Sequence, residues 1–333
     1  MSAEFMLGID CGATKCAGVL SDSTGRILAW RRAGGCFIQQ TLSAAARSEL
    51  SGLVRDLCAQ ASISRAAIRY CAIGMNGIDF DEELETQRAE VAKAVDLPAS
   101  RLGLVNDGIV ALWGLTSAPA GAILQHGTGV TAAWRRHPGG ETLFDHLNVG
   151  KLFEMRYAAL AMAARMIDGR REATPFKDRL LSRLGIGDER KFCEAVYRGR
   201  IPRDKLRGTP VLIFQAWQEG DPAAEELVRS AMEDYALTAY AMALKTRSRT
   251  PHIGFGGGVI RQAPPQFWNL MRERVQSFIP GAVVAPPELQ PEFGAAVMAA
   301  FRLGRRAGAF FHKLVKQSKE SESRPAVRDH RAG

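Results

Sequence analysis

The apolar and polar positions of the first forty residues alternate in short runs that turn residues interrupt. Strand-like runs cover residues 5–10, 16–21 and 26–31, and glycine-containing turns at residues 11–15 and 22–25 separate them. Connections this short join antiparallel neighbours. The pattern therefore predicts a three-stranded antiparallel meander.

Helices and strands alternate after the meander. Helical periodicity covers residues 43–61 and 81–95, strand patterns cover residues 68–74 and 102–105, and a short apolar helix follows residue 107. An alternating order of this kind is typical of an α/β layer.

The opening pattern returns at residue 121. Residues 121–125 and 130–135 predict two strands around a second glycine turn, and a third short strand is expected at residues 142–144. We therefore expect two α/β domains that meet near residue 115, with a ligand site at their seam.

Helices dominate the second half of the chain. Most of residues 152–245 shows helical periodicity, and Asp221-Pro222 predicts the start of a long amphipathic helix, because proline suits the first helical position. A strand at residues 252–255 then leads into three consecutive glycines. A turn at residues 286–291 precedes a further helix from residue 292.

Composition narrows the class of protein. The chain has 333 residues, of which 46% are hydrophobic and 24% charged, a balance that excludes fibrous, collagenous, coiled-coil and wholly disordered proteins. Its apolar stretches are interrupted well short of the roughly 20 residues that a membrane span needs. Residues 1–10 contain two acids and no leading cluster of lysine or arginine, so they do not resemble a secretory signal. We expect a cytoplasmic protein with no membrane partner.

The net charge of +9 is concentrated at the carboxyl end. Residues 302–333 hold nine Lys or Arg against three acids, which leaves the rest of the chain close to neutral. No recognition helix or aromatic-rich sheet motif accompanies these charges. We therefore expect a flexible basic tail at residues 316–333 and no nucleic-acid partner.

Six cysteines occur at positions 11, 16, 36, 58, 71 and 193, mostly inside apolar runs and without a C-x-x-C pair. Free cysteine in such surroundings behaves as a small hydrophobe. Neither a disulfide framework nor a zinc site is expected.

Two glycine turns are candidates for phosphate binding. The first contains Gly12, Ala13, Thr14 and Lys15, and the second contains Gly127, Thr128 and Gly129. Glycine turns expose successive backbone N–H groups that cradle phosphate oxygens, and threonine hydroxyls add donors. Taken singly, each turn is also explained as an ordinary hairpin.

Two acidic residues at strand ends are candidates for chemistry. Asp10 could hold magnesium through water, because magnesium accepts one or two carboxylates beside substrate phosphates, or it could form an Asx turn. Asp107 could accept the proton of an attacking hydroxyl. Alternatively, Asn106 or Asp107 caps the helix that follows.

A third glycine segment, Gly256, Gly257 and Gly258, follows a strand. It lacks the spacing and the distal acid of a dinucleotide fingerprint, and a glycine shelf on which a nucleobase and ribose pack fits it better. The chain also contains no G-x-x-x-x-G-K-[ST] phosphate loop.

Together these segments resemble the BadF/BadG/BcrA/BcrD ATPase family, in its N-acetylglucosamine and glucosamine kinase branch, within the superfamily of sugar kinases, actin and heat-shock chaperones. The resemblance runs from residue 7 to residue 300. Its motifs occur in the family's order: residues 7–15, Asn106-Asp107-Gly108, Gly127-Thr128-Gly129, Gly220-Asp221-Pro222, Gly256-Gly257-Gly258-Val259 and Gly294-Ala295-Ala296.

The resemblance implies an α/β fold of two ribonuclease H-like, actin-like ATPase domains with a nucleotide cleft between them. Residues 1–116, completed by a helix at about 292–315, would form the first domain, and residues 117–291 the second. It implies an ATP-dependent kinase of a sugar or amino sugar, with ATP phosphates on the two turns and Mg²⁺ near Asp10. Asp107 would be the base and would contact the sugar together with Asn106. A homodimer is also expected, since homodimers occur among relatives.

The expected sugar-binding segment departs from the family pattern. The usual G-D-E-G-S appears as Leu147-Asn148-Val149-Gly150-Lys151, which puts Asn148 at the position of the sugar-contacting aspartate. The change removes acids and adds Lys151. We therefore hypothesise an acceptor other than plain N-acetylglucosamine, such as an anionic sugar.

Two other functions compete with a kinase. One is an ATPase activator of a CoA-ester dehydratase or reductase, which carries an iron–sulfur cluster on cysteine ligands, yet no cysteine lies between Cys71 and Cys193. The other is a non-catalytic sugar-sensing regulator. The missing acidic segment and Val130, in place of the family's usual serine, favour a regulator, and the retained Asp10 and Asp107 oppose it.

Overall fold

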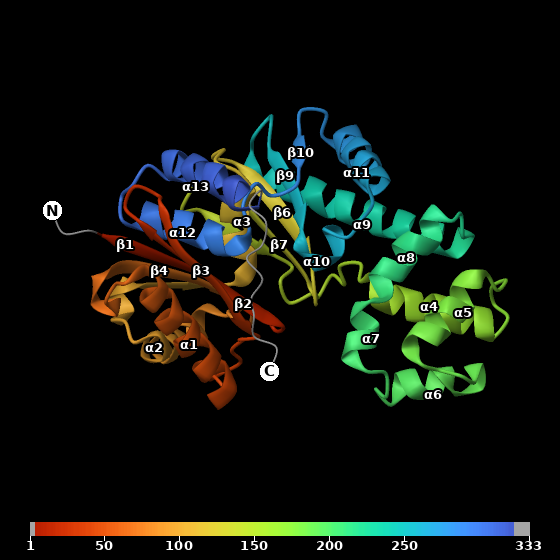
Figure 1. Cartoon of the computed structure of the whole chain (residues 1–333). Helices are drawn as coiled ribbons and strands as arrows, with labels where there is room; N and C mark the ends of the chain where they lie inside the picture. The colour runs from red at the N-terminus through yellow and green to blue at the C-terminus, as the bar shows by residue number, and fades with distance from the viewer. Residues whose placement is uncertain (1–3, 323–333) are drawn as a thin grey trace. The chain divides into compact units, whose positions relative to one another are not determined.

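The chain forms two compact α/β units in a computed structural model that describes residues 4–322 (Figure 1). Unit 1 contains the described residues up to 121, residues 137–142 and those from 287 onward. Unit 2 contains residues 122–136 and 143–286. Two five-stranded sheets of the same layout confirm the predicted α/β class and the return of the opening pattern.

The sheet of unit 1 begins with the predicted antiparallel meander. Its strands, in spatial order, are β3 (Ile27–Gly34), β2 (Lys15–Asp22), β1 (Phe5–Cys11), β4 (Ile68–Met75) and β5 (Leu102–Val105). β2 pairs antiparallel with β1 and β3, whereas β1–β4 and β4–β5 are parallel pairs. The carboxyl ends of β1, β4 and β5 therefore lie at one edge of the sheet.

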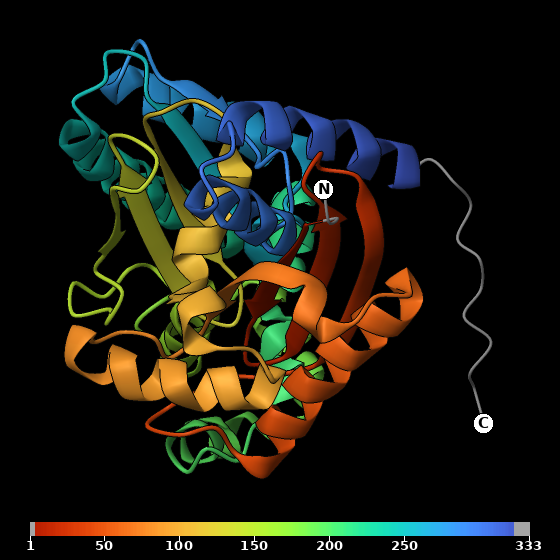
Figure 2. The same cartoon turned by 90° about the vertical axis from the view of Figure 1, so that its left-hand side faces the viewer.

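Helices cover both faces of this sheet, with α1 and α2 (orange) on one side and α12 (blue) on the other (Figure 2). The helices are α1 (Ala44–Ala61), α2 (Asp81–Val95), α3 (Asp107–Leu115), α12 (Pro291–Arg302) and α13 (Ala307–Glu322). α1 begins where predicted, because the Ser43 side chain accepts a hydrogen bond from the Ala46 N–H. Leu7 and Ile9 of β1 share one core cluster with Leu50 of α1. Since side chains alternate along a strand, Gly8 faces the α12 side.

Helix α12 approaches its neighbours closely at two glycines. A Cβ atom on Gly8 would lie 2.3 Å from the Ala296 nitrogen of α12. A Cβ atom on Gly294 of α12 would lie 2.1 Å from the Val110 oxygen of α3. Only glycine permits main chain to pack on main chain at these distances, and through these contacts α12 joins α3 to β1.

The sheet of unit 2 repeats the strand order of unit 1. Its strands, in spatial order, are β8 (Glu141–Phe144), β7 (Val130–Arg135), β6 (Gly121–His126), β9 (His252–Gly256) and β10 (Val283–Ala285). Strands β6 to β10 thus take the places of β1 to β5. β10 was not predicted, because it is three residues long and is defined by parallel pairing with β9 rather than by a local pattern.

The long helix of unit 2 begins at the predicted point. Asp221 accepts hydrogen bonds from the Ala223 and Ala224 N–H groups, and Pro222 is the first helical residue. The helices are α4 (Met155–Ile167), α5 (Pro175–Leu184), α6 (Phe192–Tyr197), α7 (Arg203–Arg207), α8 (Thr209–Gln218), α9 (Pro222–Thr246), α10 (Gly257–Ile260) and α11 (Pro265–Phe278). Short 3₁₀ helices occur at Arg65–Ala67, Ala99–Arg101 and Glu189–Lys191. Within residues 4–322, no helix is both long and apolar enough to cross a membrane.

The carboxyl-terminal helix corrects one expectation. Residues 316–322 belong to α13 and are not part of an unstructured tail. The Gln317 side chain accepts a hydrogen bond from the Ile27 N–H (3.0 Å) and donates one to the Gly25 oxygen (2.7 Å). These tertiary contacts hold the helix where its apolar periodicity has already weakened. The remainder of the expected tail, residues 323–333, lies outside the described residues.

Two glycine-to-alanine changes in helices of unit 1 should shift stability in opposite directions. Gly294→Ala forces a methyl group against the main chain of α3, so the free energy of unfolding should fall by roughly 1–3 kcal/mol. A Cβ at Gly52 of α1 would meet its nearest side-chain atom at 3.6 Å. Gly52→Ala should therefore raise the free energy of unfolding by about 0.5–1 kcal/mol through better helix propensity. Urea unfolding measures the free energy of unfolding of both variants. The same change in both would contradict the close packing of α12 on α3.

Candidate active site

The candidate residues of unit 1 gather at the carboxyl edge of its sheet. Asp10 pairs in register with Gly74 of β4, and Gly74 pairs with Val105 of β5. β5 then leads directly into Asn106 and Asp107. Parallel strands of open α/β sheets present their ligand sites at this edge.

The turn between β1 and β2 is a tight hairpin. The Gly12 N–H donates to the Lys15 oxygen at 2.9 Å, and the Gly12 oxygen accepts from the Cys36 N–H at 3.0 Å. Ala13 and Thr14 are exposed. The hairpin interpretation is therefore correct, and the same turn leaves its tip open to solvent, as a phosphate cradle requires.

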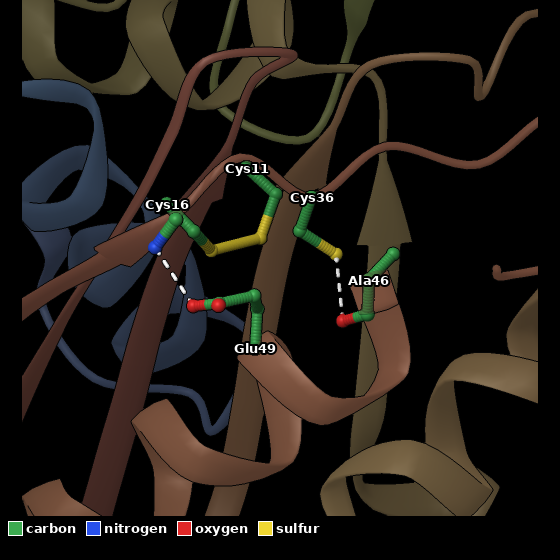
Figure 3. The surroundings of a disulfide bond; sticks show 6 residues. Cys11, Cys16, Cys36, Ala46 and Glu49 are labelled. Atoms are coloured by element: carbon green, nitrogen blue, oxygen red, sulfur yellow. Dashed lines mark hydrogen bonds between the residues drawn. A yellow bond between two sulfur atoms is a disulfide. The ribbon is translucent and has the colours of Figure 1, made fainter. Parts of the chain in front are cut away.

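A disulfide bond joins Cys11 and Cys16 across this hairpin (Figure 3). No disulfide was expected from the cysteine spacing, and for this pair the expectation is wrong. The two residues lie directly opposite each other in the β1–β2 register, with Cα atoms 4.3 Å apart. Strand pairing brings them together, whereas in the sequence each is simply a cysteine in an apolar run. The bond closes a loop around the whole turn at residues 12–15.

Cys36 lies next to this bond as a free thiol. Figure 3 shows its sulfur directed toward Ala46, whose carbonyl oxygen accepts a hydrogen bond from the thiol at 3.4 Å. Burial, together with the Glu49 carboxylate, raises the pKa of Cys36 to about 11. Because the thiolate is the species that attacks a disulfide, Cys36 is not poised to exchange with its neighbours at neutral pH.

Asn106 caps helix α3, as the capping alternative predicted. Its Oδ1 accepts from the Gly108 N–H at 2.9 Å, and its Nδ2 donates to Asp79 Oδ1 at 2.9 Å. The amide nitrogen retains one hydrogen for a ligand. Asp79 was not among the candidates predicted from the sequence, although it follows β4 closely and so reaches the same sheet edge.

Asp107 is the first residue of α3 and is not its cap. Its Oδ1 is buried, and no described residue donates a hydrogen bond to it. Burial raises the pKa of Asp107 to about 6; the Gly108 N–H opposes this rise, and the Asp79 carboxylate adds to it. A carboxyl group with this pKa is mostly ionised at pH 7 and accepts a proton readily, so the geometry supports a general base.

Asp10, at the end of β1, is partly buried. Magnesium accepts one or two carboxylates and takes water and phosphate oxygens as its other ligands, so the Asp10 carboxylate fits a magnesium–nucleotide complex. Within residues 4–322, no three His, Cys, Asp or Glu side chains are grouped to hold a metal ion by themselves. The fit therefore depends on ligands that the nucleotide would supply.

Unit 2 brings its two glycine segments together. β6 and β9 are neighbours in the sheet, so the turn at Gly127–Gly129 lies beside Gly256 and the glycines that follow it. A Cβ on Gly257, which has a φ of 87°, would lie 2.4 Å from the His126 oxygen, so only glycine permits the contact. A Cβ on Gly129 or Gly258 would meet no atom within 4 Å. This arrangement leaves the space that a phosphate turn beside a nucleoside shelf needs.

An ion network that was not predicted from the sequence lies beneath this turn. The buried His126 contacts the Tyr235 hydroxyl through Nδ1 and Glu154 Oε1 through Nε2 at 3.1 Å. Arg156 lies 2.6 Å from Glu154 Oε2 and donates to the Thr128 oxygen. Burial opposes ionisation of Glu154, but hydrogen bonds from His126 and Arg156 outweigh it and lower the pKa of this carboxyl. His126 in the turn motif was a signal in the sequence for a polar site. Glu154 and Arg156 gave no such signal, because each lies 28 residues from its partner in the turn.

The expected sugar-binding loop is held by its own polar side chains. Asn148 Oδ1 accepts from the Leu152 N–H at 2.6 Å. Asp145 accepts from the Val149 and Gly150 N–H groups at 2.8 and 2.9 Å. The Asn148 oxygen is therefore committed to the loop, and its amide nitrogen is the part that can donate to a ligand.

The sequence is similar to a known family and to a known sugar kinase. The model of the BadF/BadG/BcrA/BcrD ATPase family matches residues 7–299. An N-acetyl-D-glucosamine kinase of Dictyostelium discoideum is 24% identical over 321 residues, a match that covers 90% of this chain and 98% of that protein.

Solved structures share the fold at low sequence identity. A putative N-acetylglucosamine kinase from Chromobacterium violaceum aligns with a TM-score of 0.67 and 21% identity, covering 90% of this chain and 100% of that one. A ROK family glucokinase from Streptomyces griseus, solved in complex with glucose and AMPPNP, aligns with a TM-score of 0.54 and 21% identity, covering 90% and 98%. These likenesses show the fold.

Asp107→Asn should stabilise the protein in a pH-dependent way. Because the folded state holds the Asp107 proton more tightly than the unfolded chain does, ionisation costs stability. This loss of stability grows as the pH rises from the ordinary pKa of 3.8 to the folded-state pKa of about 6, and it is complete above that pH. The variant should therefore melt like the wild type near pH 4 and at a higher temperature at pH 7. Asp56→Asn, on the exposed surface of α1, controls for the loss of a negative charge. If Asp107→Asn melts at a lower temperature than the wild type at pH 7, the raised pKa of Asp107 is contradicted.

Alkylation should reveal the disulfide directly. In denatured, unreduced protein, four of the six cysteines should react: Cys36, Cys58, Cys71 and Cys193. Prior reduction should make Cys11 and Cys16 reactive as well. Peptide mass spectrometry locates the labels, and labelling of both Cys11 and Cys16 without reductant would rule the bond out.

Proposed function

Because the chain belongs to the BadF/BadG/BcrA/BcrD ATPase family, we propose that it is an ATP-dependent kinase that phosphorylates a hydroxyl of a sugar or amino sugar. The relative in Dictyostelium discoideum that is named for N-acetyl-D-glucosamine supports this acceptor class. The observation that carries the proposal is the Asp107 carboxylate, with a pKa of about 6 and a buried Oδ1 that no described residue engages.

Asp107 has the properties that a base for an alcohol acceptor needs. A sugar hydroxyl would donate to its Oδ1. As the hydroxyl oxygen bonds to the γ-phosphorus of ATP and ADP departs, the hydroxyl proton passes to the carboxylate. Positioning and neutralisation of charge provide most of the remaining catalysis in phosphoryl transfer.

Each of the two glycine turns would offer backbone N–H groups to phosphate oxygens of the nucleotide. Lys15 would add a point charge beside the first turn. Asp10 would hold magnesium through water, and bound magnesium would neutralise charge on the phosphate oxygens. Gly256 to Gly258 would form the shelf for the nucleoside.

For the acceptor, we propose a sugar with an anionic group near the loop at residues 147–151. Asn148 replaces an acid with an amide whose free part is a donor, because its oxygen is bound to the Leu152 N–H. Lys151 is exposed in the same loop. Both groups donate hydrogen bonds and neither accepts them, so they favour an acceptor that carries negative charge.

The competing regulator is less well supported. A buried carboxylate whose Oδ1 no described residue engages costs stability, and a protein that has lost turnover gains nothing from keeping it. A catalyst that needs a base of this pKa has a reason to keep it.

Asp107→Asn should separate the two functions. The amide cannot accept the hydroxyl proton, so kcat should fall by roughly 10²- to 10⁴-fold while the Kd for nucleotide changes little. ADP release measured over a panel of neutral, amino and acidic sugars identifies the acceptor, and calorimetry measures nucleotide binding. Asp56→Asn is the matched control and should keep wild-type turnover.

Unchanged turnover in Asp107→Asn would refute the role of the base. Wild-type protein that binds nucleotide but releases no ADP with any sugar would refute the kinase and favour the regulator.

A further inference from the structure

The peptide between Thr128 and Gly129 carries an N–H group at the open side of the turn in unit 2. Both residues are exposed, and a Cβ on Gly129 would meet no atom within 4 Å. The N–H of Gly127 is already engaged, since it donates to the Gly129 oxygen at 2.8 Å. The orientation of the Thr128–Gly129 peptide therefore decides whether this part of the turn offers a donor to a phosphate.

Arg156 fixes that orientation. Its Nη2 donates to the Thr128 oxygen from a buried position. In a trans peptide the C=O and N–H groups point in opposite directions, and the described chain contains no cis peptide. Holding the Thr128 oxygen toward Arg156 thus directs the Gly129 N–H away from the interior of unit 2.

Glu154 and His126 hold Arg156 in turn. Arg156 Nε lies 2.9 Å from both carboxylate oxygens of Glu154, which also caps α4. His126 Nε2 lies 3.1 Å from Glu154 Oε1. Because a carboxylate only accepts, this Nε2 must carry the hydrogen, and the Tyr235 hydroxyl then satisfies Nδ1. The Arg156 fork therefore meets a carboxylate that His126 and the first turn of α4 already hold in place.

We propose that Arg156 is a positioning residue that, with Glu154 and His126, presets the Thr128–Gly129 peptide for the polyphosphate of a nucleotide. The proposal rests on the proposed use of ATP but not on the identity of the acceptor. A buried ion network carries a desolvation penalty that a hydrophobic core avoids, so stability alone does not account for it. Its outermost contact is the carbonyl of an exposed turn, which is where the restraint acts.

A preset donor strengthens binding because the turn does not reorganise when the anion arrives. Without Arg156, a turn flanked by glycines samples many conformations, and the nucleotide must select the competent one. Loss of Arg156 therefore weakens nucleotide binding although no group that touches the nucleotide is removed.

Calorimetry with ADP and Mg²⁺ tests the proposal. Arg156→Met keeps an unbranched stem but removes the hydrogen bond to Thr128, so the Kd for ADP should rise roughly 10- to 100-fold. Arg156→Lys keeps the charge but lacks the planar fork that reaches Glu154 and Thr128 together, so its Kd should be intermediate. Arg274→Met is the control, because it removes a two-bond ion pair with Glu233 at the surface of the same unit. Its Kd should equal that of the wild type.

Thermal melting reports whether Arg156→Met folds. If it does not, Glu154→Gln provides the test. It retains the side-chain shape but weakens the hold on Arg156, and its Kd should rise by a smaller factor. In variants that turn over, KM for ATP should rise by more than kcat falls. If Arg156→Met is folded and binds ADP with the same Kd as the wild type, the proposal is overturned. If Arg156→Met is unfolded, an unchanged Kd for ADP in Glu154→Gln overturns it. If the wild type binds ADP but phosphorylates no sugar, the kinase fails and the positioning role stands; if it binds no ADP, both fail.

Discussion

The main chain of α12 lies against the main chain of β1 at Gly8 and against that of α3 at Gly294. Because α3 begins at Asp107, this double contact sets where the candidate base leaves the edge of the sheet. Unit 2 uses the same constraint, since the main chain at Gly257 lies on the main chain of His126. A contact that admits no Cβ leaves little freedom for the elements to slide, so each unit positions its candidate residues through backbone packing before any side chain takes part.

The two sheets share a strand order, yet the turns that follow their first strands are secured by different chemistry. Between β1 and β2, the Cys11–Cys16 bond limits how far the two strands can separate. Between β6 and β7, Arg156 orients one peptide plane through the Thr128 oxygen. A covalent crosslink restrains the loop as a whole, whereas a hydrogen bond to one carbonyl selects a direction. Equivalent places in the two sheets are thus restrained by different kinds of bond.

Two carboxyl groups illustrate how partners, rather than burial alone, set the pKa. Burial is the largest influence on both Asp107 and Glu154 and raises the pKa of each. For Glu154 the hydrogen bonds from His126 and Arg156 reverse the effect, and the group stays charged and holds Arg156. For Asp107 the neighbouring Asp79 adds to the rise, and the group retains affinity for a proton near neutral pH. The Glu154 carboxylate serves as a fixed structural charge, and the Asp107 carboxylate is suited to chemistry.

Local signals in the sequence determined the meander, the repeated strand pattern and the starts of the helices near Ser43, Asn106 and Asp221, because periodicity and capping act over a few residues. Asp107 became the candidate base through the order of motifs that the chain shares with its family rather than through a local pattern. The tertiary structure decided the Cys11–Cys16 bond, strand β10, the helical residues 316–322, the role of Asp79 and the network around His126. Each of these depends on which atoms the fold brings within a few ångströms, as when Gln317 reaches Ile27 across 290 residues of chain. Hydrogen bonds, pKa shifts and crosslinks follow from such distances, and a linear pattern does not contain them.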